Sequence, residues 1–163
     1  MATFDANGAP LPGGVVDGAA SLYVSFGSEK SHYWKLFVGT SDVGTDPAAA
    51  KCSTAFSTAL LTCNTSKTGD GGLAVTTVLV ARAVPDEPGH YAVADVKALT
   101  DADLPELRVE RNVRVFHPNG TMTSVTEGVV GPKSLDPDAI FTSSASNMTK
   151  LATDPEVARV PAS

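Results

Sequence analysis

The sequence predicts an all-β fold, an antiparallel β-sandwich of immunoglobulin-like or jelly-roll-like outline with an extended N-terminal arm and a polar C-terminal tail. About seven short apolar or alternating runs recur at regular spacing, separated by turns rich in Gly and Pro. No helical period is sustained over several turns. The 163 residues suit one domain, which we divide into the arm at 1–20, the sandwich at 21–130 and the tail at 131–163.

The first elements are an arm and a hairpin. Residues 1–20 hold two prolines and four glycines, which disfavour regular structure. Apolar side chains then alternate through 21–26 and again through 32–38, on either side of a polar turn at 27–31. Two alternating runs around a short polar turn predict a β-hairpin.

The segment from 47 to 63 carries mixed signals. Asp46 followed by Pro47 is a helix start, with an aspartate cap and a proline at the first helical position, so we expect a short helix near 47–52. Alanines after it favour a helix, whereas the many Ser and Thr residues favour a strand. We expect a strand near 55–63.

The middle of the chain predicts two strands. Residues 73–84 are rich in β-branched residues and apolar on both faces, which is typical of a central strand. Residues 90–99 form another apolar run after a turn, and we expect a strand there as well.

The last strands form a second hairpin. Valines alternate with charged and polar side chains through 107–116, as in a half-solvated strand. The turn at 117–120 ends in a glycine, and 121–130 returns as its partner. Prolines and many Ser and Thr residues then predict the tail, with a short helix near 136–142 capped by Asp136.

Charge and hydropathy exclude two classes of partner. Twelve basic residues stand against eighteen acidic ones, giving a formal net charge of −6, and the basic ones are spread along the chain. Nucleic-acid binding depends on neutralising phosphates, so we expect no nucleic-acid partner. No apolar run reaches the ~20 residues that span a bilayer, so we expect no membrane insertion. The N-terminus lacks the basic and apolar regions of a signal peptide, and we expect Met1 to be a translation start.

Two cysteines, Cys52 and Cys63, leave two alternatives open. In a continuous helix their eleven-residue separation would place them about 16 Å apart along the axis. A disulfide needs Cα atoms within about 7 Å. A bridge therefore requires a hairpin or loop between them, and the sequence is compatible with both the bridged and the free state.

The sequence signals no catalytic, metal or cofactor site. His32, His90 and His117 lack the close spacing of zinc ligands, and we expect His32 and His117 to face solvent beside turns. The cluster around His90, with Asp86 and Glu87, fits a solvated loop. The Gly-rich stretch around Asp70 fits a tight turn rather than a calcium loop. We therefore expect a protein that is not an enzyme.

Two kinds of binding or modification residue remain. Asn64, Asn119 and Asn147 each begin an N-x-Ser/Thr sequence in a predicted loop and are glycan acceptors if the protein enters a secretory pathway. Because Ser and Thr are abundant, such sequences also arise by chance. Tyr33 and Phe37 share one face of their strand, which makes them a candidate exposed contact face.

These observations favour a structural role. Extended Gly- and Pro-rich ends are ordered most readily by packing on neighbours. We expect a structural protein of a large assembly, a virion capsid, decoration or tail component, whose partners are copies of itself or other structural subunits. In that reading the ends of the chain, 1–20 and the segment after Gly131, touch other subunits. The alternative is a secreted or cell-surface glycoprotein module that binds a carbohydrate or a receptor.

Overall fold

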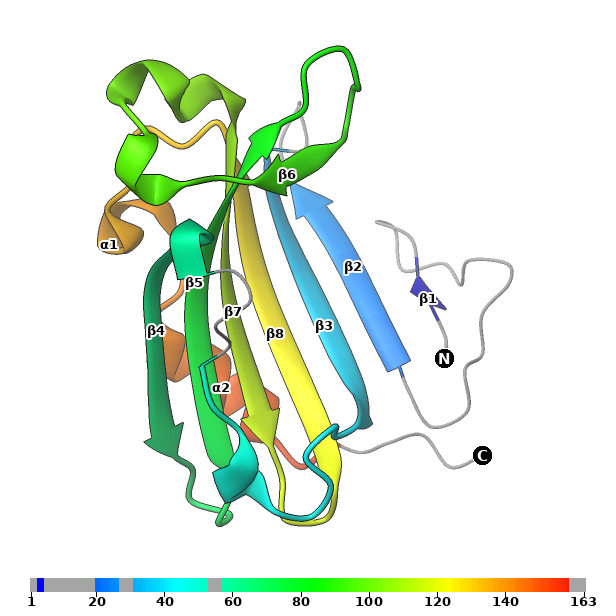
Figure 1. Ribbon diagram of the computed structural model, residues 1–163. Coiled ribbons are helices and arrows are strands. Elements are labelled where there is room, and N and C mark those ends of the chain that lie inside the picture. The colour runs from blue at the N-terminus through cyan, green and yellow to red at the C-terminus, as the bar shows by residue number, and fades with distance from the viewer. Residues whose placement is uncertain (1–2, 5–19, 27–30, 53–56, 159–163) are drawn as a thin grey trace.

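The computed structural model describes residues 3–4, 20–26, 31–52 and 57–158 (Figure 1). For 3–4 and 20–26 only the backbone is described. The fold is mostly antiparallel β-sheet with a few short helices, so the all-β prediction is confirmed at this level. The predicted arm at 1–20 and the turn at 27–31 lie almost entirely outside these ranges.

One eight-stranded sheet organises the described residues. Its strands are β1 (Thr3–Phe4), β2 (Ala20–Phe26), β3 (His32–Thr40), β4 (Leu60–Lys67), β5 (Leu73–Ala83), β6 (Tyr91–Val93), β7 (Leu107–Phe116) and β8 (Thr121–Val130). Their order is β1-β2-β3-β8-β7-β5-β4, and β6 pairs with β5 beyond the end of β4. All these pairings are antiparallel except β1 with β2.

The helical elements are short. Four are 3₁₀ turns: η1 (Pro47–Ala49), η2 (Ser57–Ala59), η3 (Val96–Ala98) and η4 (Asp101–Glu106). Two are α-helices, α1 (Pro137–Ile140) and α2 (Ala145–Thr153). The predicted helix near 136–142 is confirmed as α1, because Pro137 takes its first turn and the Asp136 side chain accepts from the Asp138 amide.

Both predicted hairpins are present. β2 and β3 pair from Ala20 opposite Val38 to Phe26 opposite His32. β7 and β8 are joined by the 117–120 turn, where Gly120 has a φ of +83°. β5 lies between β7 on one side and β4 and β6 on the other, as expected for a central strand.

Two predicted segments differ from the structure. The strand expected near 55–63 begins at Leu60 and runs to Lys67, and the helix expected near 47–52 is the single 3₁₀ turn η1. The strand expected at 90–99 ends after Val93, because Asp95 caps η3 by accepting from the Lys97 amide. In the second segment a local Asp cap thus overrides the apolar pattern.

The predicted sandwich is replaced, in the described residues, by a single sheet with helices on one face. Figure 1 shows α2 behind the sheet and α1 beside its left edge. Helix α2 packs on β7 and β8, and its Met148 and Ala152 are fully buried. The segment expected as a polar tail therefore supplies the second layer of the core, through Phe141, Met148 and Ala152.

The face covered by the helices holds most of the core. On β7 the fully buried residues are Leu107, Val109, Val113 and Val115, which is the predicted alternation. One cluster surrounds Met148, and a second, next to α1 and η4, surrounds Phe141. Burying one apolar face of the sheet in this way supplies the main stabilising free energy of the fold.

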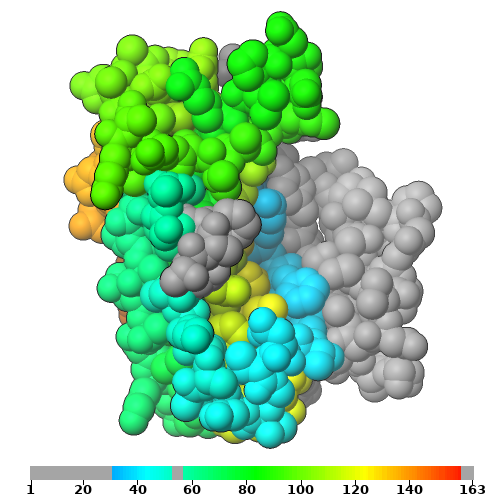
Figure 2. All heavy atoms as spheres, in the orientation of Figure 1, coloured from blue at the N-terminus to red at the C-terminus, as the bar shows by residue number. Residues whose placement is uncertain are grey.

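The opposite face carries a smaller core beneath the 41–52 segment. Figure 2 shows this segment, in cyan, over the lower part of the sheet, with β7 and β8 visible in yellow beside it. Ala50 packs with Val75 and Phe116 there. Cys52 and Cys63 are joined by a disulfide, with their Cα atoms 6.0 Å apart, so the bridged alternative applies. The bridge ties the segment to β4.

Candidate functional site

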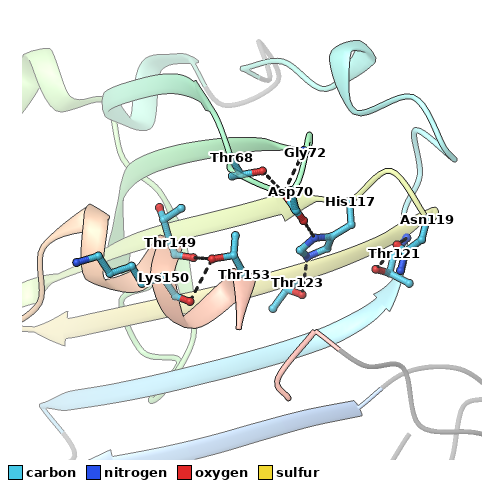
Figure 3. A network of polar contacts seen from close by, with 10 residues as sticks. All are labelled: Thr68, Asp70, Gly72, His117, Asn119, Thr121, Thr123, Thr149, Lys150 and Thr153. Carbon is cyan, nitrogen blue, oxygen red and sulfur yellow. Dashed lines mark hydrogen bonds and ion pairs between the residues drawn. The ribbon is translucent and has the colours of Figure 1, made fainter. Parts of the chain in front are cut away.

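A buried histidine connects two turns and a strand at one end of the sheet (Figure 3). His117 is only 5% exposed, so the expectation that it faces solvent is wrong. Its Nδ1 lies 2.8 Å from Asp70 Oδ2, and its Nε2 lies 3.1 Å from Thr123 Oγ1. Asp70 comes from the 68–72 turn, where it also accepts from the Thr68 hydroxyl and the Gly72 amide. The tight turn predicted around Asp70 is present.

The environment of Asp70 favours its ionised form. Burial alone raises the pKa of this carboxyl. Hydrogen bonds from Thr68, His117 and the Gly72 amide outweigh that effect and hold the pKa below its usual value. A carboxylate therefore faces the imidazole, which orients the ring and holds the 68–72 turn against the end of β7.

The order of groups in this network, a hydroxyl, an imidazole and a carboxylate, is that of a catalytic relay. Whether the network can act in catalysis depends on whether its hydroxyl is accessible to a substrate. Thr123 is completely buried on the helix-covered face, so its hydroxyl cannot reach a substrate. We therefore assign the network a structural role in joining the 68–72 turn, β7 and β8.

A second histidine lies on a buried carboxylate at the other end of the sheet. His32 Nε2 is 2.7 Å from Glu127 Oε1, and the His32 side chain is 26% exposed. Glu127 is fully buried and also accepts from the Thr142 amide, the Thr142 hydroxyl and the Ser143 amide. Because these bonds fix the connection between α1 and α2, Glu127 ties both β3 and the helices to β8.

His32 lines a recess of about 880 Å³ between the end of β8, η4 and α1. Its lining is both polar and apolar: Leu104, Val129 and Ile140 contribute apolar surface, and Asp101 and Lys133 contribute charged groups. An imidazole oriented by a carboxylate is a frequent acid–base arrangement. Here the same carboxylate also holds the backbone of the helical layer, so its geometry is explained by folding alone.

Two smaller recesses lie on opposite faces, each of about 510 Å³. The one between β4, β5 and α2 is lined by hydroxyl groups and by Lys67 and Lys150. The Thr149 and Thr153 hydroxyls there donate to carbonyls of α2 (Figure 3). The other recess lies beneath the 41–52 segment and contains Arg114.

The outer strand β4 offers a different kind of site. It pairs with β5 along one edge, and within the described residues nothing pairs with its other edge. Residues 64–67 are exposed, as is Thr62. An edge of this kind presents unpaired backbone N–H and C=O groups that can accept another strand.

The predicted aromatic contact face is not exposed. Tyr33 is only 4% exposed and Phe37 is half-buried, so the prediction is wrong for Tyr33. The physical reason is its cross-strand partner: Gly128 on β8 has no side chain, and the Tyr33 ring occupies that space. The Tyr33 hydroxyl donates to Glu110 on β7, the strand on the other side of β8.

The three candidate glycan acceptors are all exposed. Asn119 lies in the 117–120 turn, as predicted, whereas Asn64 lies on β4 and Asn147 in the first turn of α2, so the loop prediction is wrong for these two. The Asn119 side-chain oxygen accepts from the Thr121 amide at 3.0 Å and from the Thr121 hydroxyl at 2.7 Å. Exposure keeps each of them accessible to modification.

No metal site is formed in the part of the chain that the structure describes, since no three His, Cys, Asp or Glu side chains converge there. His90 makes only an exposed pair with Glu87, at 3.1 Å. Among the described helices, none has the length and apolar character needed to cross a membrane.

Comparison with protein-family models, with curated protein sequences and with solved structures gave no match.

Proposed function

We propose that this chain is a structural subunit of a large assembly, such as a virion capsid, decoration or tail, and that it joins copies of itself edge to edge through β4. The observation that supports this proposal is that no strand in the described part of the chain pairs with the outer edge of β4. In addition, the buried ionisable side chains Arg111, His117 and Glu127 all make contacts that hold the fold together. An inert body with an open edge suits assembly.

The sequence of β4 lacks the usual protection against strand pairing. Sheet edges are commonly blocked by lysines, prolines or bulges. In β4 the register shift lies between Leu60 and Thr62, and the lysine is the last residue, Lys67. Residues 62–66, Thr-Cys-Asn-Thr-Ser, carry no charge and no proline. This stretch can therefore accept a partner strand.

A second copy of the same strand is the partner we propose. Two identical strands that pair antiparallel are related by a twofold axis, so each residue of the edge finds its symmetric counterpart. Thr62 and Thr65 lie on this edge, and a threonine that faces a threonine stabilises a cross-strand pair. The result would be one sheet continuous through two subunits.

Light-scattering mass measured over a concentration series tests this proposal. We expect the wild-type chain to associate reversibly, and a Thr62→Lys/Thr65→Lys variant to stay monomeric, because lysines on the edge repel their symmetric copies. The matched control is Ala98→Lys, which adds a charge at an exposed position of η3. A wild-type chain that is monomeric at every concentration, or an edge variant that associates like wild type, contradicts the proposal.

A second candidate function is a secreted or cell-surface glycoprotein module that binds a carbohydrate or a receptor. The Cys52–Cys63 disulfide favours it, because disulfides persist mainly in oxidising compartments. The exposure of Asn64, Asn119 and Asn147 is compatible with it. Intact mass after expression in secreting eukaryotic cells distinguishes the two, since glycans add hexose mass that disappears in an Asn→Gln variant at the modified site.

A further inference from the structure

Arg114 differs from the other arginines that the structure describes. Arg82 binds two carboxylates, Arg111 donates to two backbone carbonyls, and Arg108 lies 3.8 Å from a glutamate oxygen. Arg114 has neither a hydrogen-bond acceptor nor a carboxylate within reach among the described residues. The contact that it makes is with the ring of Phe116, whose centroid lies 5.7 Å from the guanidinium carbon.

The guanidinium belongs to a recess with one charged side and one apolar side. Arg114 and Phe116 project from β7 into the space beneath the 41–52 segment, which is about 510 Å³ in volume. Val43, Ala50 and Cys52 supply apolar surface to the lining. Lys51 and Asp42 are the other charged residues of the lining, and both are exposed. A half-buried cation in such a recess, without a counter-ion among the residues that the structure describes, requires an explanation.

We propose that this recess binds the carboxylate group of a small molecule with an apolar or aromatic body. The guanidinium is a planar fork whose paired N–H groups match the two oxygens of a carboxylate. Lys51 adds a second positive charge, whereas Asp42 disfavours ligands with several negative charges. The apolar lining and the Phe116 ring receive the body of the ligand.

The site is held in place before any ligand arrives. Across the strands Arg114 lies between Val75 of β5, which is fully buried, and Ser124 of β8. The opposite wall is fixed by the packing of Ala50 on this face of the sheet and by the disulfide from Cys52 to β4. Such preorganisation lowers the entropic cost of binding. Reduction of the disulfide should therefore weaken the site.

Nuclear magnetic resonance titration of the oxidised chain tests the proposal, with benzoate as the probe and benzamide as its neutral isostere. We expect saturable benzoate shifts at Arg114, Phe116 and residues 42–52, and binding of benzamide weaker by about tenfold or more. An N-acetylated dipeptide that ends in a free carboxylate forms a second arm. Comparing the binding of this dipeptide with that of benzoate distinguishes two sources of the ligand, the carboxyl end of a peptide and a free small acid.

Variants separate the site from general surface charge. Arg114→Gln should weaken benzoate binding at least about tenfold while keeping the far-ultraviolet spectrum and the disulfide. Arg82→Gln, which removes an exposed arginine elsewhere, should bind like wild type. If benzoate does not bind the oxidised chain, binds no better than benzamide, or binds the Arg114→Gln variant equally well, the assignment is overturned. If benzoate bound equally well after reduction of the disulfide, the role of the disulfide in holding the wall of the recess would be refuted.

Discussion

Arg111 and Glu127 face each other directly across β7 and β8, and they bind the two backbone groups of one residue, Ser143. Arg111 Nη1 donates to the Ser143 carbonyl at 2.6 Å, and Glu127 Oε2 accepts from the Ser143 amide at 3.1 Å. Both side chains lie on the helix-covered face and are buried. This pair of opposite charges fixes the connection between α1 and α2, and thereby the position of the helical layer on the sheet.

Glu127→Gln should destabilise the fold by about 3 kcal/mol, because Gln keeps only one accepting oxygen and cannot accept both the Thr142 bonds, which go to Oε1, and the Ser143 bond, which goes to Oε2. Urea unfolding followed by circular dichroism measures the change. Glu87→Gln is the control, since Glu87 makes only an exposed pair with His90, and we expect a change within about 0.5 kcal/mol. Equal stabilities of the two variants would show that Glu127 does not hold the helices.

Gly128→Ala should destabilise by about 2 kcal/mol, because a Cβ at this position would overlap the ring of Tyr33. Displacing the ring also removes the hydrogen bond from its hydroxyl to Glu110. Gly69→Ala is the matched control: a Cβ there meets nothing within 4 Å, so its stability should stay close to that of wild type. The same unfolding measurement applies, and a Gly128 variant as stable as the Gly69 variant would contradict the close approach of the ring.

The sheet could be predicted from the sequence because local alternation encodes it. Valines at every second position of β7 mark its buried face, and the turn at 117–120 fixes the hairpin with β8. Arg111 occupies one of those buried positions, and this exception was the signal for a buried arginine. Its acceptors could not be predicted, since Ser143 lies 32 residues away and only tertiary packing brings it near.

The helical layer was harder to predict for a similar reason. Helix α2 reads Ala-Ser-Asn-Met-Thr-Lys-Leu-Ala-Thr, in which Ser, Asn and Thr are weak helix formers. It is stabilised instead by the Ser144 cap and by burial of Met148 and Ala152 against β7 and β8. The His117–Asp70 contact likewise joins residues 47 apart in the chain, and the sequence predicts a turn at each position but not that the two turns meet.

Acid should remove the stability that Glu110 contributes. Burial alone raises the pKa of Glu110, but hydrogen bonds from Tyr33 and Lys35 and the positive charges of Lys35 and Arg108 outweigh it, so the pKa lies below the usual 4.5. A carboxyl whose pKa is lower in the folded state stabilises the fold above its unfolded pKa. That contribution is lost as the pH falls below 4.5 and through the folded pKa.

The measurement is the difference in unfolding free energy between wild type and Glu110→Gln across a pH series. We expect a constant difference above about pH 5.5, which shrinks as the pH falls below about 4.5. Glu87→Gln provides the comparison, because its exposed carboxylate should leave a small difference throughout, within about 0.5 kcal/mol. If the difference in unfolding free energy between wild type and Glu110→Gln grew as the pH fell, its pH dependence would have the opposite sign. A lowered pKa of Glu110 would then be excluded.

Removing the disulfide should loosen one face of the sheet while leaving the other intact. Cys52 and Cys63 close a loop with a sequence separation of eleven, for which the loss of chain entropy in the unfolded state predicts about 3 kcal/mol of stabilisation. In a Cys52→Ala/Cys63→Ala variant we expect that loss in urea unfolding.

Hydrogen exchange should become faster in the 41–52 segment, which the bridge ties to β4, because local opening then costs less free energy. Exchange in α2, which is anchored through Ser143 and Met148 on the opposite face, should accelerate only through global unfolding. Equal acceleration of local opening on both faces would contradict this division of the core.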